Sequence, residues 1–144
     1  MSLHPERLIA IRRDPRMATA RFAHAGIGRL VLRPLCPEDA EAFGRYLEGL
    51  GPESRRRFGP HPHTMAEARR LCGELARSEA LRLLAVREGA GEAVGYFILY
   101  PGVRPAEVHR YASYGVALQG ETDCTFAPSI ADAWQGQGLG SAVM

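Results

Sequence analysis

The residues with the clearest chemical purpose form a glycine-rich stretch near the end of the sequence, Gln135-Gly136-Gln137-Gly138-Leu139-Gly140-Ser141. Its three glycines alternate directly after a strand pattern. Glycine permits positive φ angles and lets a ligand approach the backbone closely. The stretch also leads into the start of a helix, where free N–H groups and the positive end of the helix dipole favour an anion. These properties predict a cradle for a pyrophosphate group.

Three kinds of phosphate cradle compete for this stretch. A P-loop requires a lysine, and all 18 basic residues of this chain are arginines. The dinucleotide fingerprint GxGxxG is nearly met by Gly136, Gly138 and Ser141, but its last position should be glycine or alanine. That fingerprint also opens a βαβ unit and needs an acidic ribose ligand about 20 residues later, whereas the sequence ends at Met144. The third kind is an acyl-CoA cradle.

Apolar periodicity predicts the elements that position this stretch. Apolar runs predict strands at about 29–35, 81–87, 93–100 and 121–130. Apolar residues at helical spacing predict two helices, the first ending at Gly51 and the second ending near Arg77. Thr64 and Glu67 predict a capping box at the start of the second helix.

The remaining segments show no clear period. Residues 1–27 are predicted to be an irregular N-terminal arm, and the Gly- and Pro-rich residues 52–63 a loop. Residues 103–120 fit a loop, with or without a short strand at 111–118. A helix beginning near Gly138 would have about seven residues, which is under two turns. The sequence is therefore expected to be truncated inside an element.

The stretch Gln135-Gly136-Gln137-Gly138-Leu139-Gly140 resembles the Q/R-x-x-G-x-G/A motif of the GNAT superfamily of acyl-CoA N-acyltransferases. Residues 126–140 are similar to the branch that contains bacterial protein acetyltransferases, and residues 32–40 and 50–55 are similar to earlier segments of the superfamily. The resemblance covers residues 28–144. It implies an α/β (α+β) fold in which helices flank a mixed, mostly antiparallel sheet, with the C-terminal lobe missing.

The resemblance also implies an activity, the transfer of an acetyl group from acetyl-CoA to an amine by direct attack. The strand end at Ile130 and Ala131 would pair its backbone with the pantetheine arm, because in the family the strand splays from its neighbour there. The CoA pyrophosphate would be held by the loop residues Gln135, Gly136, Gln137, Gly138, Leu139, Gly140 and Ser141. Trp134 would either shape this loop or simply pack on the core.

The sequence departs from the resembled branch at the catalytic base. The base must take a proton from the substrate ammonium before the neutral amine can attack. Thr125 stands where that branch often has a glutamate, so Glu121 and Asp123 are the substitutes, although both also fit solvated carboxylates at a strand start. The general acid, usually a tyrosine on a later helix, is expected beyond Met144. The alternative function is therefore a non-catalytic acyl-CoA-binding or partner-binding module.

Other residue groups have ordinary structural explanations. His61 and His63 have metal-ligand side chains, but Pro60 and Pro62 force an extended loop without an obvious third ligand, so no metal site is predicted. The run of arginines at 55–57 fits a solvated face better than a site for an acidic partner or the 3′-phosphate of CoA. Two tyrosines in the segment 103–120, Tyr111 and Tyr114, are expected to pack rather than to line a pocket.

Composition bounds the remaining possibilities. The 144 residues suit one domain at roughly 150 residues per domain, with an arm over 1–27 and the acetyltransferase-like part over 28–144. A net charge of +2 is too mild to imply a nucleic-acid partner. No apolar run approaches the ~18 residues of a membrane span, and the charged N-terminus lacks a signal-peptide core, so a cytoplasmic protein without a membrane partner is expected.

Partners follow from the same observations. The acceptor is an amine of a small molecule or of a protein lysine, and the sequence leaves that choice open. A last strand without later neighbours would expose unpaired backbone groups. Self-association through residues 121–144 is therefore predicted.

Overall fold

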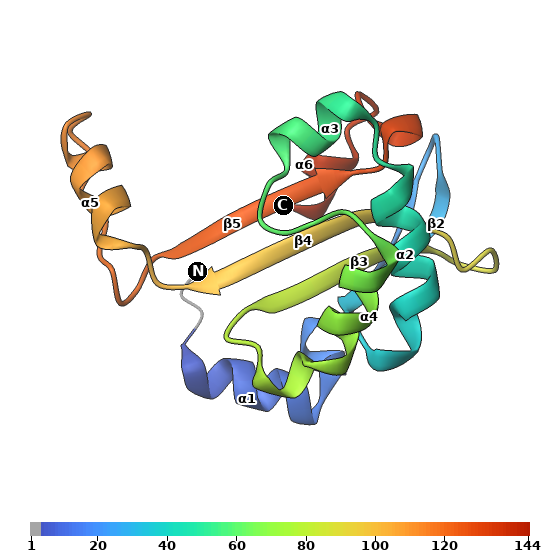
Figure 1. Cartoon of the computed structure of the whole chain (residues 1–144), viewed down its shortest axis with the longest axis horizontal. Coiled ribbons are helices and arrows are strands. Elements are labelled where there is room, and N and C mark those ends of the chain that lie inside the picture. The colour runs from blue at the N-terminus through green and yellow to red at the C-terminus, as the bar shows by residue number, and fades with distance from the viewer. Residues whose placement is uncertain (1–3) are drawn as a thin grey trace.

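The computed structural model describes residues 4–144 and contains one five-stranded sheet (Figure 1). The strands lie in sequence order, and every adjacent pair is antiparallel. The sheet consists of β1 (Ala20–His24), β2 (Gly28–Pro34), β3 (Leu81–Arg87), β4 (Ala93–Pro101) and β5 (Cys124–Ile130). The predicted mostly antiparallel α/β fold is confirmed. β5 forms one edge of the sheet in the described part of the chain.

Helices cover both faces of this sheet, because the central strands bury side chains on both sides. Along β4, Tyr96 and Ile98 point into one core and Phe97 into the other, as the two-residue period of a strand requires. The first core lies under α2 (Ala40–Gly49) and α4 (Met65–Gly73), with α3 (Pro52–Arg57) beside them. The second core lies under α1 (Pro5–Arg13) and α6 (Leu139–Val143).

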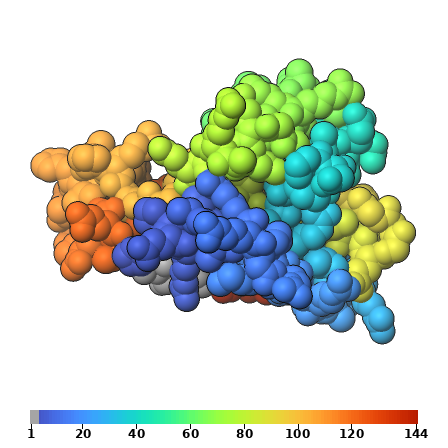
Figure 2. Space-filling view, turned by 90° about the horizontal axis from the view of Figure 1, so that it is seen from below, coloured from blue at the N-terminus to red at the C-terminus, as the bar shows by residue number. Residues whose placement is uncertain are grey.

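The expectation of an irregular arm over residues 1–27 is wrong for the described part of that segment. It folds into α1, a short 3-10 turn (Pro15–Ala18) and β1. Only Leu8 and Ile11 of α1 are buried, so the sequence carries too little periodicity to reveal the helix. Figure 2 shows this N-terminal segment spread over the lower face of the molecule.

The predicted loop over 52–63 is also wrong in its first half, because Pro52 begins α3. Proline suits the first helical position, and the three arginines at 55–57 occupy the last turn of that helix. Residues 103–120 form neither a plain loop nor a strand. They contain α5 (Pro105–Ala112), which buries none of its residues and stands away from the sheet in Figure 1. β5 begins at Cys124, three residues after the predicted start.

The capping box is half present. Thr64 Oγ1 accepts a hydrogen bond from the Glu67 backbone N–H at 3.1 Å. The Glu67 carboxylate does not reach back to the helix start, because it forms an ion pair with Arg70 instead.

No helix within residues 4–144 is long and apolar enough to cross a membrane.

Candidate functional site

The glycine-rich stretch forms a tight loop between β5 and α6. Gly136 and Gly138 adopt φ angles of +72° and +80°, and a Cβ at either position would meet nothing within 4 Å. Glycine is thus required there by backbone conformation rather than by crowding, and open space lies above the loop. Gly138 is the N-cap of α6, and no side chain caps that helix start. Its first N–H groups are available to a ligand.

Side chains from a distant segment hold the beginning of this loop. Asp132 Oδ2 accepts from the Gly51 N–H at 3.1 Å, and Asp132 Oδ1 accepts from Ser54 Oγ at 2.6 Å. Gln135 Nε2 donates to Ser54 Oγ at 2.8 Å and to the Ile130 carbonyl at 2.9 Å. The start of α3 and the end of β5 are therefore locked together. Sequence reasoning gave no role to Asp132 and Ser54, whose only signals were the similarities of residues 126–140 and 50–55 to the superfamily.

A second contact holds the middle of the loop from the other face. His24 Nε2 donates to the Gln137 carbonyl at 2.7 Å. Leu139 is fully buried in the second core, so it anchors α6 rather than facing a ligand. Trp134 packs against the same core, and the Arg87 guanidinium lies 5.2 Å from its ring centroid. Trp134 thus both packs and shapes the loop.

β5 remains paired with β4 up to the loop. The Ala131 N–H donates to the Val94 carbonyl at 2.9 Å, so the strand does not splay on this side. Alternation along an antiparallel strand then turns the backbone groups of Phe126, Pro128 and Ile130 away from β4. Because Pro128 has no N–H to donate, its place on the outer side costs no ladder hydrogen bond. The strand therefore presents an edge that pairs with no further strand of the described chain, and at its end beside the glycine loop the Ile130 carbonyl is held by Gln135 Nε2.

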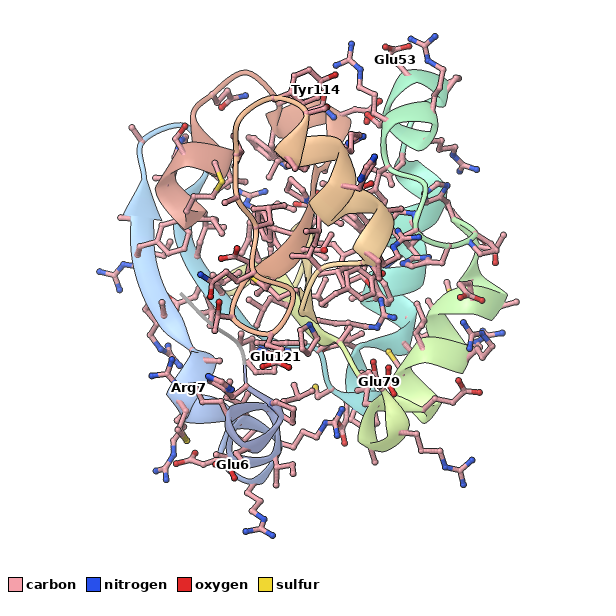
Figure 3. All side chains as sticks on the ribbon, turned by 90° about the vertical axis from the view of Figure 1, so that its left-hand side faces the viewer. Glu6, Arg7, Glu53, Glu79, Tyr114 and Glu121 are labelled. Carbon is pink, nitrogen blue, oxygen red and sulfur yellow. The ribbon has the colours of Figure 1, made fainter. Side chains whose placement is uncertain are left out.

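Two hollows lie along this edge. The small hollow, about 290 Å³, is lined by residues of α3, the strand end and the loop, among them Ser54, Ile130, Gln135 and Gly140. The large hollow, about 920 Å³, continues toward α5 and is lined by residues 57–60, 100–104 and 125–128 together with Gly120. Arg57, Phe58 and Pro128 line both, so the hollows adjoin. Figure 3 views the molecule from the α5 side, where the large hollow lies.

The structure brings the predicted cofactor residues together and places the two predicted catalytic carboxylates elsewhere. Ile130, Ala131 and residues 135–141 are continuous around the strand end and loop. Glu121 is exposed in the turn before β5 (Figure 3), and Asp123 Oδ2 accepts from the Gln119 N–H at 2.8 Å. Both carboxylates lie at the opposite end of β5, roughly 20 Å from Ile130 at 3.3 Å per residue.

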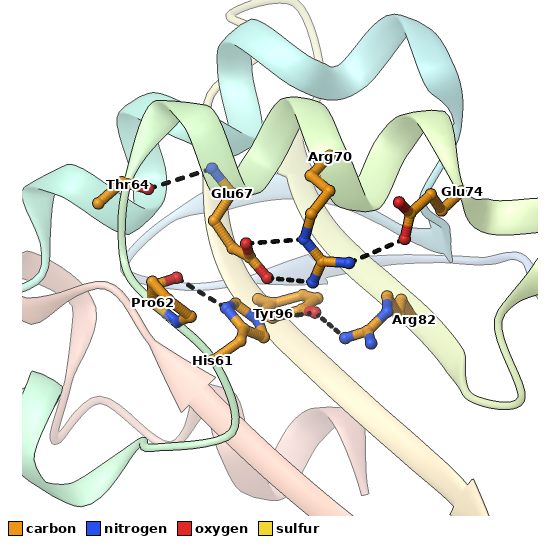
Figure 4. Close-up of polar contacts among 8 residues, drawn as sticks. All are labelled: His61, Pro62, Thr64, Glu67, Arg70, Glu74, Arg82 and Tyr96. Atoms are coloured by element: carbon orange, nitrogen blue, oxygen red, sulfur yellow. Dashed lines mark hydrogen bonds and ion pairs between the residues drawn. The ribbon is translucent and has the colours of Figure 1, made fainter.

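A partly buried polar cluster of His61, Arg82 and Tyr96 (Figure 4) packs against Phe58, which lines the large hollow. Arg82 Nη1 donates to the Tyr96 hydroxyl at 2.6 Å, and that hydroxyl lies 3.2 Å from His61 Nε2. Burial lowers the pKa of His61, with the opposing influence of a hydrogen bond to Pro62 O. Within residues 4–144, no group of three or more potential ligands could hold a metal ion.

The arginine run divides into two roles. Arg55 donates to the carbonyls of Leu50 and Glu48 at 2.6 and 2.7 Å and so caps the end of α2. Arg56 and Arg57 are exposed and both pair with Glu53. Tyr111 and Tyr114 are also exposed rather than packed as expected, since α5 buries no residue.

Comparison with known proteins places this arrangement in a family. The acetyltransferase (GNAT) domain matches residues 29–144, which is most of the chain. The chain therefore belongs to the GNAT acetyltransferase family, and the resemblance deduced from the glycine loop is confirmed. Acetyltransferases of this family use acetyl-CoA. No curated protein matches the sequence.

Solved structures share the fold. The GNAT domain of S. lividans PAT superposes with a TM-score of 0.60 at 20% identity, covering 90% of this chain and 69% of that one. Ribosomal-protein-S5-alanine acetyltransferase from Vibrio fischeri gives a TM-score of 0.55 at 14% identity, covering 87% and 62%. RimJ from Mycobacterium smegmatis, in complex with CoA-disulfide, gives 0.52 at 16%, covering 86% and 56%. This chain thus spans between about half and two thirds of the length of these structures.

Proposed function

We propose that this chain binds acetyl-CoA at the end of β5 and transfers the acetyl group to an amine. The observation that carries the proposal is the unpaired edge of β5 running into a loop with two left-handed glycines, beside the small hollow. An extended chain with amide groups can lie along such an edge, and the loop amides and helix start can bind the anion at its end.

Seven of the nine predicted cofactor residues have a distinct role in this proposal. The outward N–H of Ile130 meets the pantetheine arm, because the Ile130 carbonyl is held by Gln135. Ala131, whose N–H is bonded to the Val94 carbonyl, fixes the strand end. The amides around Gly136 and Gly138 hold the pyrophosphate, and Ser141 lies exposed in the first turn of α6. Gln135 and Leu139 support the loop from below through their contacts with Ser54 and the second core.

The large hollow takes the acceptor, because it adjoins the small hollow at Phe58 and Pro128. The amine nitrogen attacks the thioester carbonyl, the C–N bond forms, the C–S bond breaks, and the CoA thiolate leaves and takes up a proton. The amine loses its proton to water in the hollow, because Glu121 and Asp123 do not line the hollow and Asp123 lies roughly 16 Å along the chain from Pro128. Of the two, Glu121 is exposed, whereas Asp123 already accepts a backbone hydrogen bond.

Calorimetry with acetyl-CoA, CoA and NAD tests the proposal. We expect binding of acetyl-CoA and CoA, and no comparable binding of NAD. Gly138→Asp should abolish binding, because its carboxylate occupies the anion site and its φ angle disfavours a side chain. Gly73→Asp, at an open position at the end of α4, is the matched control and should bind normally. Comparable NAD binding, or unchanged binding by Gly138→Asp, would overturn the assignment.

A non-catalytic acyl-CoA-binding module is the second candidate. It is favoured by one observation, the polar group at position 125. Thr125 donates its hydroxyl to the Gly102 carbonyl at 3.3 Å and cannot serve as a base. A thiol-release assay with a panel of amines separates the two candidates. CoA binding together with amine-dependent thiol release supports the transferase, and binding without thiol release supports the module.

A further inference from the structure

The large hollow has two walls that are built differently. One wall is the segment 58–60 that follows α3, and the other is the segment 100–104 that leads from β4 into α5. The outer half of β5 forms the floor between them. Its volume of about 920 Å³ is at the upper end of the range for small-molecule sites, which suits several residues of an extended peptide.

The first wall is fixed before any acceptor arrives. The Phe58 ring lies edge-on to the rings of His61 and Tyr96, with centroids 5.9 and 5.7 Å away. Arginine can only donate, so the Tyr96 oxygen accepts from Arg82 and its hydrogen is left for His61 Nε2 (Figure 4). The other ring nitrogen of His61 donates to Pro62 O at 2.8 Å. With both nitrogens satisfied, the ring and its wall have one defined position.

The charge that lines the hollow has a single sign. Arg57 and Arg104 are the charged residues among the described lining, one at each wall. No described residue forms an ion pair with Arg104. Glu53 accepts from Arg57 at 2.9 Å, but it is shared with Arg56, so the Arg57 charge is only partly compensated. A hollow with this lining attracts carboxylates and repels cations.

From these three observations we infer that the acceptor is a peptide amine followed by acidic residues. The inference rests on the acetyl transfer proposed above. An amine placed at the junction of the two hollows has Arg57 beside it, and the next residues of the peptide run toward Arg104. Guanidinium groups recognise carboxylates through paired, charge-assisted hydrogen bonds. A peptide with basic residues at those positions is excluded by the same two arginines.

Calorimetric titration of the 144-residue chain, with CoA present to avoid turnover, tests this inference. Three peptides are compared, each with a free N-terminal alanine. The two residues after the alanine are both aspartate in the first peptide, both asparagine in the second and both arginine in the third. We expect the aspartate peptide to bind about tenfold more tightly than the asparagine peptide, since two exposed charge pairs are worth roughly this factor. The arginine peptide should bind more weakly than both, and the preference should shrink as salt is raised.

Two variants assign the preference to the named residues. In the double variant Arg57→Gln/Arg104→Gln, the aspartate and asparagine peptides should bind with about equal affinity, so that the ratio of their affinities falls to about one. The affinity of the asparagine peptide should stay the same as for the unmodified chain. Arg77→Gln is the control, since Arg77 is exposed but does not line the hollow, and it should keep the ratio. Equal affinities for the three peptides, a ratio that survives the double variant, or no measurable peptide binding would overturn the inference.

The design separates this inference from the proposed function. CoA binding is measured first, without peptide. A chain that binds CoA but does not discriminate the peptides loses the acidic-acceptor inference alone. A chain that does not bind CoA, yet keeps the arginine-dependent preference, refutes the transferase and retains the hollow as a site for acidic peptides.

Discussion

The two ends of β5 are built in opposite ways. At the Ile130 end, side chains from α3 and β1 fix the glycine loop through Asp132 and through the His24 contact to the Gln137 carbonyl. At the Cys124 end, the chain passes through α5, which buries none of its residues, and Tyr114 is 76% exposed. The fixed end is suited to one cofactor of constant shape. The projecting end, with few buried contacts, can adjust to a varied partner.

The largest expected effect comes from releasing the fixed end. Asp132→Ala removes the acceptor of both the Gly51 N–H and the Ser54 hydroxyl, so the contact between Gln135 and Ser54 alone still ties the loop to α3. Because hydrogen bonds to a charged group are worth about 1.5–3 kcal/mol, acetyl-CoA affinity should fall roughly ten- to hundredfold. Calorimetry measures the loss. Glu107→Gln, a change on α5 at a half-buried residue, is the control at the projecting end. Equal losses in the two variants would contradict the difference between the two ends.

Removing one hydroxyl at each end of β5 tests whether the two ends contribute differently to the free energy of unfolding. Ser129 Oγ is buried, donates to the Tyr96 carbonyl at 3.1 Å and accepts from the Tyr46 hydroxyl at 2.8 Å. Ser129→Ala leaves the buried Tyr46 hydroxyl without this partner and should cost about 1–2 kcal/mol of unfolding free energy. Thr125→Ala, whose hydroxyl makes one longer bond in a half-buried place, should cost about 0.5 kcal/mol or less. Urea unfolding of both variants gives the two values, and the reverse order would contradict the expectation.

His61, which packs against Phe58 and Tyr96, predicts a pH dependence of stability. Burial lowers its pKa below the usual 6.5, so the unfolded chain takes up a proton that the folded chain refuses. Stability should be complete above about pH 6.5 and should decrease as the pH falls toward the folded-state pKa, with a slope of at most about 1.4 kcal/mol per pH unit for one proton. Unfolding midpoints between pH 7 and 5.5 measure this slope. His61→Gln should flatten it and His109→Gln, on exposed α5, should not.

The smallest expected effect is weak self-association through residues 121–144. The unpaired edge of β5 favours strand addition, but Pro128 removes one outward donor and limits it. Sedimentation at tens of micromolar should show a dimer in exchange with monomer. Pro128→Thr restores the N–H and should strengthen the association. A clean monomer for both chains would remove the free edge as an interaction surface.

Sequence patterns predicted the elements that bury an apolar stripe better than the elements and contacts that do not. β2, β3, β4, α2, α4 and the glycine loop carry strong apolar periods or turn residues, and the structure places them as predicted. The helices α1, α3 and α5 were not predicted, because α1 buries two residues and α3 and α5 bury none, which leaves no apolar stripe in the sequence. The contacts of Asp132 and His24 join segments about 80 and 113 residues apart in the chain. No local pattern encodes such pairs.

The His24 contact has a consequence for how the loop presents its dipoles. The chain has no cis peptide bond within residues 4–144, so in each peptide group the C=O and N–H point in opposite directions. By holding the Gln137 carbonyl, the His24 ring also makes the N–H of Gly138, which belongs to the same peptide group, point away from His24. A side chain on β1 thus sets the direction of one peptide dipole in the loop.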